Sequence, residues 1–161
     1  MDRWVRSYVD GQESSVFQYL RTLLAGNQSS VPGVSGAVAQ FQRFEKDLQQ
    51  DFFALAAQSG KPRDLRWVSG EWLDELLIVV DEESQLISAF ASINISFEAV
   101  EGGEMVDVEA VSTIRDGTAV FHFQDEGWGS AGRVVFNMSP AKAAEHIIPE
   151  ADTVFYRKPP Q

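Results

Sequence analysis

The chain of 161 residues contains no cysteine and only two histidines. The lack of cysteine excludes disulfides, thiol nucleophiles, zinc fingers and iron–sulfur ligation. It also fits a reducing compartment, where structural disulfides are rare. Because His122 and His146 are the only imidazoles, a multi-histidine metal site is not expected either. We therefore expect a protein without a metal or other cofactor.

Long apolar runs are also missing. No run approaches the 18 residues that indicate a membrane-spanning helix, and residues 1–6 have no apolar core of signal-peptide length. We therefore expect a cytoplasmic protein that does not bind membranes. Hydrophobic residues make up 44% of the chain and charged residues 23%, which is typical of a globular protein. The length predicts one domain over 1–161, with a helical part over 1–62 and a sheet part over 63–161.

Basic residues are scarce in the middle of the chain. The whole sequence carries 13 basic and 24 acidic side chains, a net charge of −11. Residues 71–126 hold 14 acidic side chains and a single basic one, Arg115. Such a field repels phosphate backbones and anionic lipids, so nucleic acid is not an expected partner. The acidity either serves solubility or forms a docking face for a basic partner or for cations.

Helical periodicity dominates the first third of the chain. Residues 14–25 are predicted to form a short helix, and residues 26–36 form the one linker-like stretch. A longer helix follows, with Ser35 as its N-cap and Gly60 just beyond its end. Its apolar stripe should pack against a sheet; the stripe consists of Ala37, Phe41, Phe44, Leu48, Phe52 and Leu55.

The period changes to two after residue 75. The uninterrupted apolar run Leu76–Val80 predicts a strand buried on both faces. A turn over Asp81–Ser84 then leads into residues 86–100, which alternate over a long run. Further elements are predicted beyond this strand: strands over 104–115, 118–125 and 132–138, a short helix capped by Ser139 with Pro140 at its first position, and an edge strand over Thr153–Arg157.

Two glycine-containing pairs, Gly102-Gly103 and Asp116-Gly117, predict two-residue hairpin loops. Both registers place apolar residues of three neighbouring strands on one face. The predicted fold class is α+β, with two N-terminal helices on one face of a curved antiparallel meander of five to six strands. This layout, over residues 14–138, resembles the cystatin-like and NTF2-like architectures. Such layouts host enzymes, ligand binders and dimerisation modules, so the resemblance selects no function.

The opposite face of the predicted sheet is polar. The hairpin registers place His122 in one row with Asn94, and Glu109 one row away, within diagonal cross-strand reach. A carboxylate beside an imidazole orients it and raises its pKa, which suits a general base. His122, Glu109 and Asn94 are thus candidate catalytic residues. An exposed polar sheet face and a non-catalytic binding surface explain the same pattern.

Three further acidic residues, Glu98, Asp107 and Glu126, fall in one predicted cross-strand row. Like charges directly opposite each other are destabilising, and fraying, a bound cation or a partner's basic side chain would relieve them. No calcium-loop pattern is present. These three residues are therefore candidate binding residues rather than a predicted metal site.

The segment from Gly127 to Gly132 matches the pattern G-x-G-x-x-G. A dinucleotide site would need a helix after the last glycine, whereas an apolar strand pattern follows here. The match also resembles the glycine-rich hairpin of protein kinases, but the strand lysine and the other kinase motifs are missing. We therefore predict a glycine-rich hairpin tip, with Trp128 as a candidate contact residue.

Two functional hypotheses follow from these patterns. The first is a non-enzymatic binding or adaptor domain whose acidic sheet surface contacts a basic protein partner, with self-association through the sheet as an additional expectation. The second is a cofactor-independent ligand-binding protein or enzyme, acting by proton transfer or hydrolysis, with a pocket around His122. The sequence contains no complete catalytic set, which favours the first hypothesis.

Overall fold

The computed structural model describes residues 33–59, 62–104 and 114–157. The predicted helix over 14–25 and most of the predicted strand over 104–115 lie outside these residues. Two helices and six strands are present in the described part: α3 (Val34–Gln58), β1 (Leu65–Asp81), β2 (Ile87–Ala99), β3 (Arg115–Gln124), β4 (Gly127–Gly129), β5 (Val134–Phe136), α4 (Pro140–Ile147) and β6 (Ala151–Arg157).

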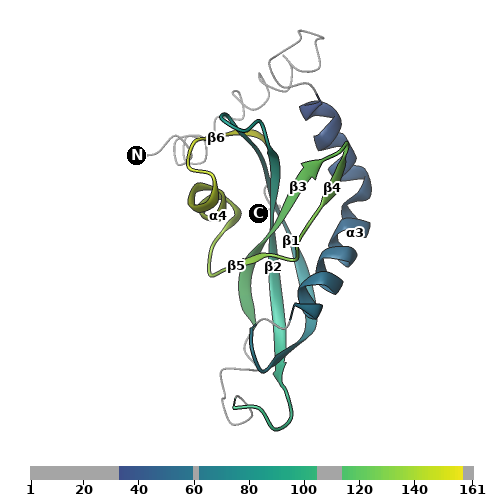
Figure 1. Ribbon diagram of the computed structural model, residues 1–161, viewed down its shortest axis with the longest axis vertical. Helices are drawn as coiled ribbons and strands as arrows, with labels where there is room; N and C mark the ends of the chain where they lie inside the picture. The colour runs from purple at the N-terminus through teal and green to yellow at the C-terminus, as the bar shows by residue number, and fades with distance from the viewer. Residues whose placement is uncertain (1–32, 60–61, 105–113, 158–161) are drawn as a thin grey trace.

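The strands form one antiparallel sheet of six strands (Figure 1). β1, β2, β3 and β4 are neighbours in chain order and thus form a meander, β5 pairs with a second stretch of β3, and β6 lies on the outer side of β1. The predicted α+β class and antiparallel sheet are confirmed. The sheet is not strongly curled, so the expected curvature is not observed (Figure 1).

The two helices lie on opposite faces of the sheet (Figure 1). Residues Leu76 to Val80 of β1 explain this arrangement, because they are all buried. Leu76 and Ile78 belong to the core under α3, whereas Leu77 and Val79 pack with Ala143 and Ala144 of α4. A strand that is apolar on both faces needs a cover on each. Of the two N-terminal helices predicted for one face, only α3 lies within the described residues, and α4 covers the other face. The predicted two-sided burial of this strand is confirmed.

The predicted second helix is confirmed as α3, which begins at Val34 and ends at Gln58. Ser35 lies inside the first turn, because the N-cap position is occupied by Gly33 at φ +93°. The predicted N-cap is therefore wrong, and Gly60 lies outside the described residues. The predicted apolar stripe is partly wrong too: Phe44 is 42% exposed and Leu55 is 46% exposed.

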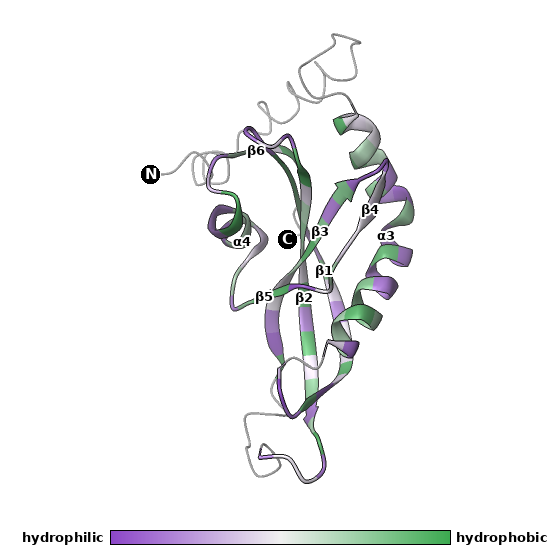
Figure 2. Cartoon of the chain, viewed as in Figure 1, coloured by the Kyte–Doolittle hydropathy of each residue, from purple (hydrophilic) through white to green (hydrophobic). Residues whose placement is uncertain are grey.

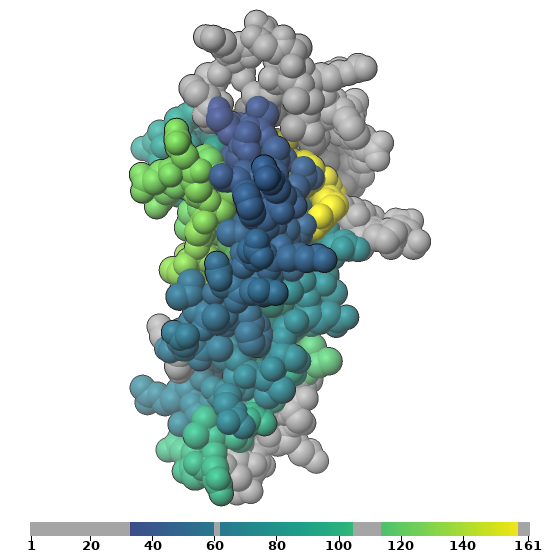
Figure 3. All heavy atoms as spheres, turned by 90° about the vertical axis from the view of Figure 1, so that its right-hand side faces the viewer, coloured from purple at the N-terminus to yellow at the C-terminus, as the bar shows by residue number. Residues whose placement is uncertain are grey.

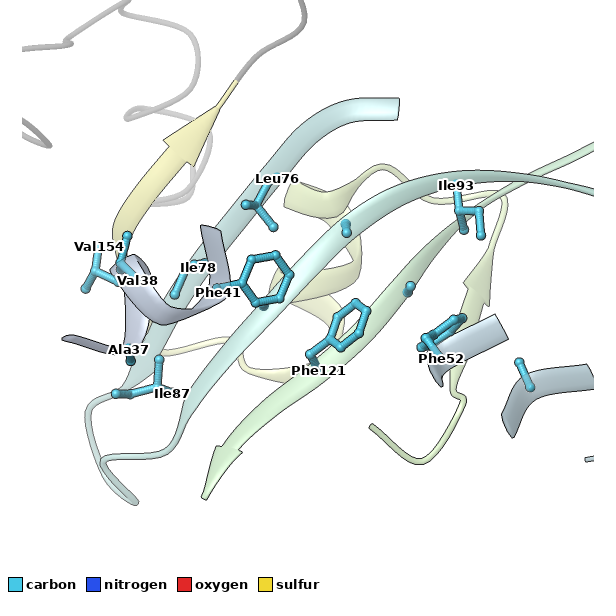
Figure 4. Packing of buried hydrophobic residues seen from close by; sticks show 14 of the residues in the cluster. Ala37, Val38, Phe41, Phe52, Leu76, Ile78, Ile87, Ile93, Phe121 and Val154 are labelled. Carbon is cyan, nitrogen blue, oxygen red and sulfur yellow. The ribbon is translucent and has the colours of Figure 1, made fainter. Parts of the chain in front are cut away.

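The core under α3 is built from phenylalanines that face the sheet. Phe41 and Phe52 of α3 are fully buried and both contact Phe121 of β3, with ring centroids 5.4 and 5.2 Å apart (Figure 4). Ile78 and Ile93 complete the sheet side of this cluster. Hydrophobic and hydrophilic residues alternate along β2 (Figure 2). This alternation places its apolar side chains under α3, as predicted.

The predicted hairpin at Asp116-Gly117 is wrong. Both residues lie inside β3, where Gly117 pairs with Ile93 on one side and Phe136 on the other. A Cβ atom on Gly117 would come within 2.7 Å of the Cγ1 atom of Val134. Glycine is therefore needed here for close strand packing and not for a turn. As a consequence β3 lies directly beside β2, and the cross-strand rows computed from this hairpin change.

Three other local predictions are confirmed. The turn after β1 is fixed by Asp81, whose carboxylate accepts hydrogen bonds from the Glu83 N–H and the Ser84 hydroxyl. These two bonds also lower the pKa of Asp81. α4 begins at Pro140, and the Ser139 hydroxyl caps it by accepting from a first-turn N–H. β6 forms the expected edge strand.

Candidate functional site

The β3–β4 hairpin and the irregular chain that follows it form the most distinctive region of the described structure. The hairpin turns at Asp125 and Glu126, whose φ angles are +51° and +61°. Two successive left-handed residues are typical of a type I′ turn, which matches the twist of the flanking strands. The turn leads into β4, whose three residues pair with the end of β3. Figure 3 shows this hairpin in light green beside the upper half of α3.

Between β4 and β5 the edge of the sheet contains a large, irregular bulge. Residues 130–133 lie opposite only two residues of β3, Val120 and Phe121. The Ser130 hydroxyl fills the gap, since it donates to the Val120 carbonyl at 2.7 Å and accepts from the Gly132 N–H at 3.0 Å. The bulge is therefore hydrogen-bonded rather than frayed. Such bulges bend a strand and re-aim its side chains.

The expectation that Trp128 is an exposed contact residue is not met, because its side chain is directed towards α3. Its indole Nε1 donates a 2.7 Å hydrogen bond to the Ala37 carbonyl. The ring also packs edge-on against Phe41, with centroids 5.0 Å apart, and lies near Phe123. Trp128 thus attaches β4 to α3. The glycine-rich segment is not a hairpin tip either, because the tip is the Asp125–Glu126 turn.

His122 lies on the opposite face of β3, next to Ser88 of β2. The Ser88 hydroxyl is 2.9 Å from the Nδ1 atom of His122, and Ser88 itself is fully buried. Burial lowers the pKa of His122 below its ordinary value of 6.5, and the positive charge of Arg133 lowers it further. His122 is therefore a neutral imidazole at pH 7. A buried serine without access to solvent orients the ring but is unsuited to act as a nucleophile.

An open depression with a cavity volume of about 480 Å³ lies beside His122. It is lined by His122 and Gln124 of β3, Asp125 of the turn, and residues 127–131 of β4 and the bulge. We call it the His122 depression. Its volume falls within the roughly 300–1,000 Å³ of small-molecule sites. Among the described residues that line it, Asp125 is the only acidic one and none is a lysine or arginine.

The structure does not bring the candidate catalytic residues together. Asn94 pairs with Asp116, and it lies six residues along β2 from Ser88, the partner of His122. At about 3.3 Å per residue this separates Asn94 from the His122 row by roughly 20 Å. The predicted Asn94–His122 row is therefore wrong, and Glu109 lies outside the described residues. Within the described ranges, no three His, Asp or Glu side chains cluster as metal ligands would.

The predicted acidic row is also absent. Glu98 lies near one end of β2 and forms an ion pair with Arg66 of β1. Glu126 follows the other end of β3, beyond the Ile87–Phe123 pair, so roughly 35 Å of strand separates it from Glu98. Asp107 lies outside the described residues. The row depended on the Asp116-Gly117 hairpin and fails with it.

The acidic residues gather instead at one end of the sheet. Three connections meet there, because Val80 pairs with Ile87 and Asp81 pairs with Ala151, while β3 ends beside the start of β2. We call residues 81–86, 125–126 and 148–152 the acidic end. They contain no lysine or arginine and seven acidic residues: Asp81, Glu82, Glu83, Asp125, Glu126, Glu150 and Asp152.

Sequence reasoning missed the acidic end and the role of Ser88. The acidic end joins turns that are far apart in the chain, so only the sheet topology reveals it. Ser88 is one of the alternating polar residues of β2, and nothing in its neighbours marks it as a histidine partner. The pair Asp125-Glu126 lacks the glycine that usually marks a type I′ turn.

No helix in the part of the chain that the structure describes is long and apolar enough to cross a membrane. Comparison with known proteins adds no family: no family model, no curated protein and no solved structure matches the chain.

Proposed function

We propose that the protein is a non-enzymatic, cytoplasmic binding domain that engages a basic protein partner through the acidic end. The observation that carries this proposal is the meeting of three described connections that contain seven acidic residues and no lysine or arginine of their own. Their combined field attracts a basic surface and accelerates its association. The absence of cysteine supports a reducing compartment. The helix followed by a meander supports a cystatin-like or NTF2-like layout.

The opposite end of the sheet provides a natural contrast. Glu98 there is paired with Arg66, and Arg63 and Arg115 lie in the neighbouring segments. Glu101 and Glu104, which follow β2, therefore belong to an end of the sheet that carries basic as well as acidic residues. A basic partner is attracted less by this mixed surface than by the acidic end.

The test measures binding of a short fluorescent peptide of alternating arginine and serine by fluorescence anisotropy. The double variant Glu83→Gln/Glu150→Gln should weaken binding about threefold to tenfold, since each exposed charge contributes about 0.2–1 kcal/mol. The matched variant Glu101→Gln/Glu104→Gln removes the same charge and should have a smaller effect. Affinity should also fall as salt rises towards about 0.15 M. Equal effects of the two variants, or affinity that ignores salt, would contradict the proposal.

A second function is favoured by one specific observation, the His122 depression with its oriented, neutral imidazole. This arrangement supports a cofactor-independent ligand site or a proton-transfer enzyme with His122 as the base. His122→Gln should then abolish binding of a small molecule found by screening. Self-association through the sheet is the other proposal, and sedimentation at rising protein concentration tests it.

A further inference from the structure

Two glycines of β4 have no structural reason to be glycine. Neither Gly127 nor Gly129 adopts a left-handed backbone conformation. A Cβ atom on Gly129 would meet nothing within 4 Å, and one on Gly127 would meet only the Gln124 carbonyl at 3.9 Å. Glycine in a strand is unfavourable by roughly 0.5–1 kcal/mol. It often marks a place where a ligand or another backbone approaches closely.

These two glycines form the floor of the His122 depression. Gly129 pairs with His122 and Gly127 pairs with Gln124, so all four residues face the same side of the sheet. The two side chains that would otherwise cover the floor are missing, and the peptide planes of β4 are left bare. A flat group can therefore lie against this strip, bounded by the imidazole of His122 and the amide of Gln124.

The charges around the depression indicate which kind of planar group it would bind. Asp125 supplies a carboxylate at the edge, next to Glu126 in the acidic end. His122 is neutral at pH 7, and Arg133 does not line the depression although its charge reaches His122. The site thus offers hydrogen-bond acceptors and one negative charge beside a flat floor. A guanidinium group is planar, permanently charged and able to stack and donate several hydrogen bonds at once.

We propose that the His122 depression receives an arginine side chain of the basic partner, with the guanidinium flat over Gly127 and Gly129 and paired with Asp125. This inference rests on the proposed function and adds a specificity to it. The acidic end attracts any basic chain, whereas the depression distinguishes arginine from lysine. An ammonium group is compact and strongly hydrated, so the bare floor gives it no comparable surface.

The experiment uses the full chain labelled with ¹⁵N and two small probes, N-acetyl-arginine N-methylamide and its lysine counterpart. The arginine probe should shift the amide signals of Gly127 and Gly129 and saturate at lower concentration than the lysine probe. Gly129→Ala should weaken the arginine probe about fivefold or more, because the added methyl group occupies the floor. Asp125→Asn should weaken it about tenfold, as expected for a lost charged hydrogen bond. Gly36→Ala is the matched control, since a Cβ there also meets nothing within 4 Å, and it should leave binding unchanged.

The outcomes separate this inference from the proposed function. If Glu83→Gln/Glu150→Gln weakens the arginine–serine peptide but Gly129→Ala changes neither peptide nor probe, the acidic end stands and the arginine site is wrong. Equal binding of the arginine and lysine probes also overturns the arginine site. If Gly129→Ala weakens the arginine probe and the acidic-end variant leaves the peptide unaffected, the arginine site stands and the proposed function is wrong.

Discussion

A single glycine, Gly132, allows the bulge to approach the backbone of α3 closely. Gly132 has a φ of +72°, and a Cβ atom there would come within 2.8 Å of the backbone nitrogen of Ala56. The helix backbone cannot move aside as a flexible side chain could. Gly132→Ala should therefore lower the free energy of unfolding by at least about 2 kcal/mol, from the left-handed conformation and the overlap together.

Urea unfolding followed by circular dichroism measures this change. Gly129→Ala is the control, since it lies three residues away in open space with an ordinary backbone, and it should leave stability unchanged or raise it by up to about 1 kcal/mol. If the two substitutions destabilise the protein equally, the close approach of the bulge to α3 is not as described.

His122 predicts a dependence of stability on pH. Its pKa is lowered in the folded protein, so between this pKa and the unfolded value near 6.5 the unfolded chain binds more protons. The free energy of unfolding should therefore fall as the pH drops from about 7 towards 5. His122→Gln should remove part of this slope.

An NMR titration of the two imidazoles checks the cause directly. The His122 signal should titrate below the ordinary value, and Arg133→Gln should raise its pKa because a repelling positive charge is removed. The pKa should still stay below the ordinary value, since burial is the larger cause. A normal pKa for His122 would mean that its sheet face is open to water.

At the scale of whole elements, one ion pair fastens the last strand to the long helix. Arg157 of β6 donates two hydrogen bonds to the Glu45 carboxylate of α3, at 3.1 and 2.6 Å, and a third to the Asp74 carbonyl at 3.0 Å. The bonds that Arg157 donates to Glu45 raise the pKa of Arg157. Because lysine cannot reproduce this fork, Arg157→Lys should lower the free energy of unfolding by about 1–2 kcal/mol.

A double-mutant cycle with Glu45→Gln isolates the contribution of the pair. Its coupling energy should be about 1 kcal/mol. The pair Arg66–Glu98 provides the comparison, since those side chains are 73% and 43% exposed, and exposed pairs contribute little. A coupling energy for Arg157–Glu45 no larger than that of Arg66–Glu98 would show that β6 is held by its backbone pairing alone.

The elements themselves were largely predictable, whereas their pairing was not. Local patterns show which face of an element is buried. Examples are the apolar stripe of α3, the two-sided burial of Leu76–Val80 and the alternation of β2. The predicted register depended on two dipeptides, and one of them, Asp116-Gly117, has the composition of a turn but the environment of a central strand. Glycine suits both a tight turn and close strand packing. Only the position of Val134, which leaves no room for a Cβ atom on Gly117, shows that close packing is the reason here. Because the cross-strand rows were computed from this hairpin, the sequence indicates His122 as a candidate site residue but not its hydrogen-bond partner Ser88.

At the scale of the whole molecule, charge is unevenly distributed along the sheet. The chain carries a net charge of −11. The described segments of the acidic end contain seven acidic residues and no lysine or arginine, while those of the other end contain Arg63, Arg66 and Arg115 as well as acids. Like charges held close together in the folded state oppose folding. Salt screens this repulsion, because the Debye length falls to about 10 Å at 0.1 M ionic strength. The midpoint of thermal unfolding should therefore rise as salt is added from about 0.01 to 0.15 M.

The same pair of charge variants locates the repulsion. Glu83→Gln/Glu150→Gln should raise the unfolding midpoint in low salt by about 2–4 °C, which corresponds to about 1 kcal/mol for a chain of this size. This gain in the unfolding midpoint should shrink as salt screens the remaining charges.

Glu101→Gln/Glu104→Gln should give a smaller gain, because that end of the sheet also carries Arg63, Arg66 and Arg115. Because the acidic end is both the proposed docking surface and the site of strongest repulsion, binding of a basic peptide there should raise the midpoint too. An equal gain from the two variants would instead mean that only the net charge matters.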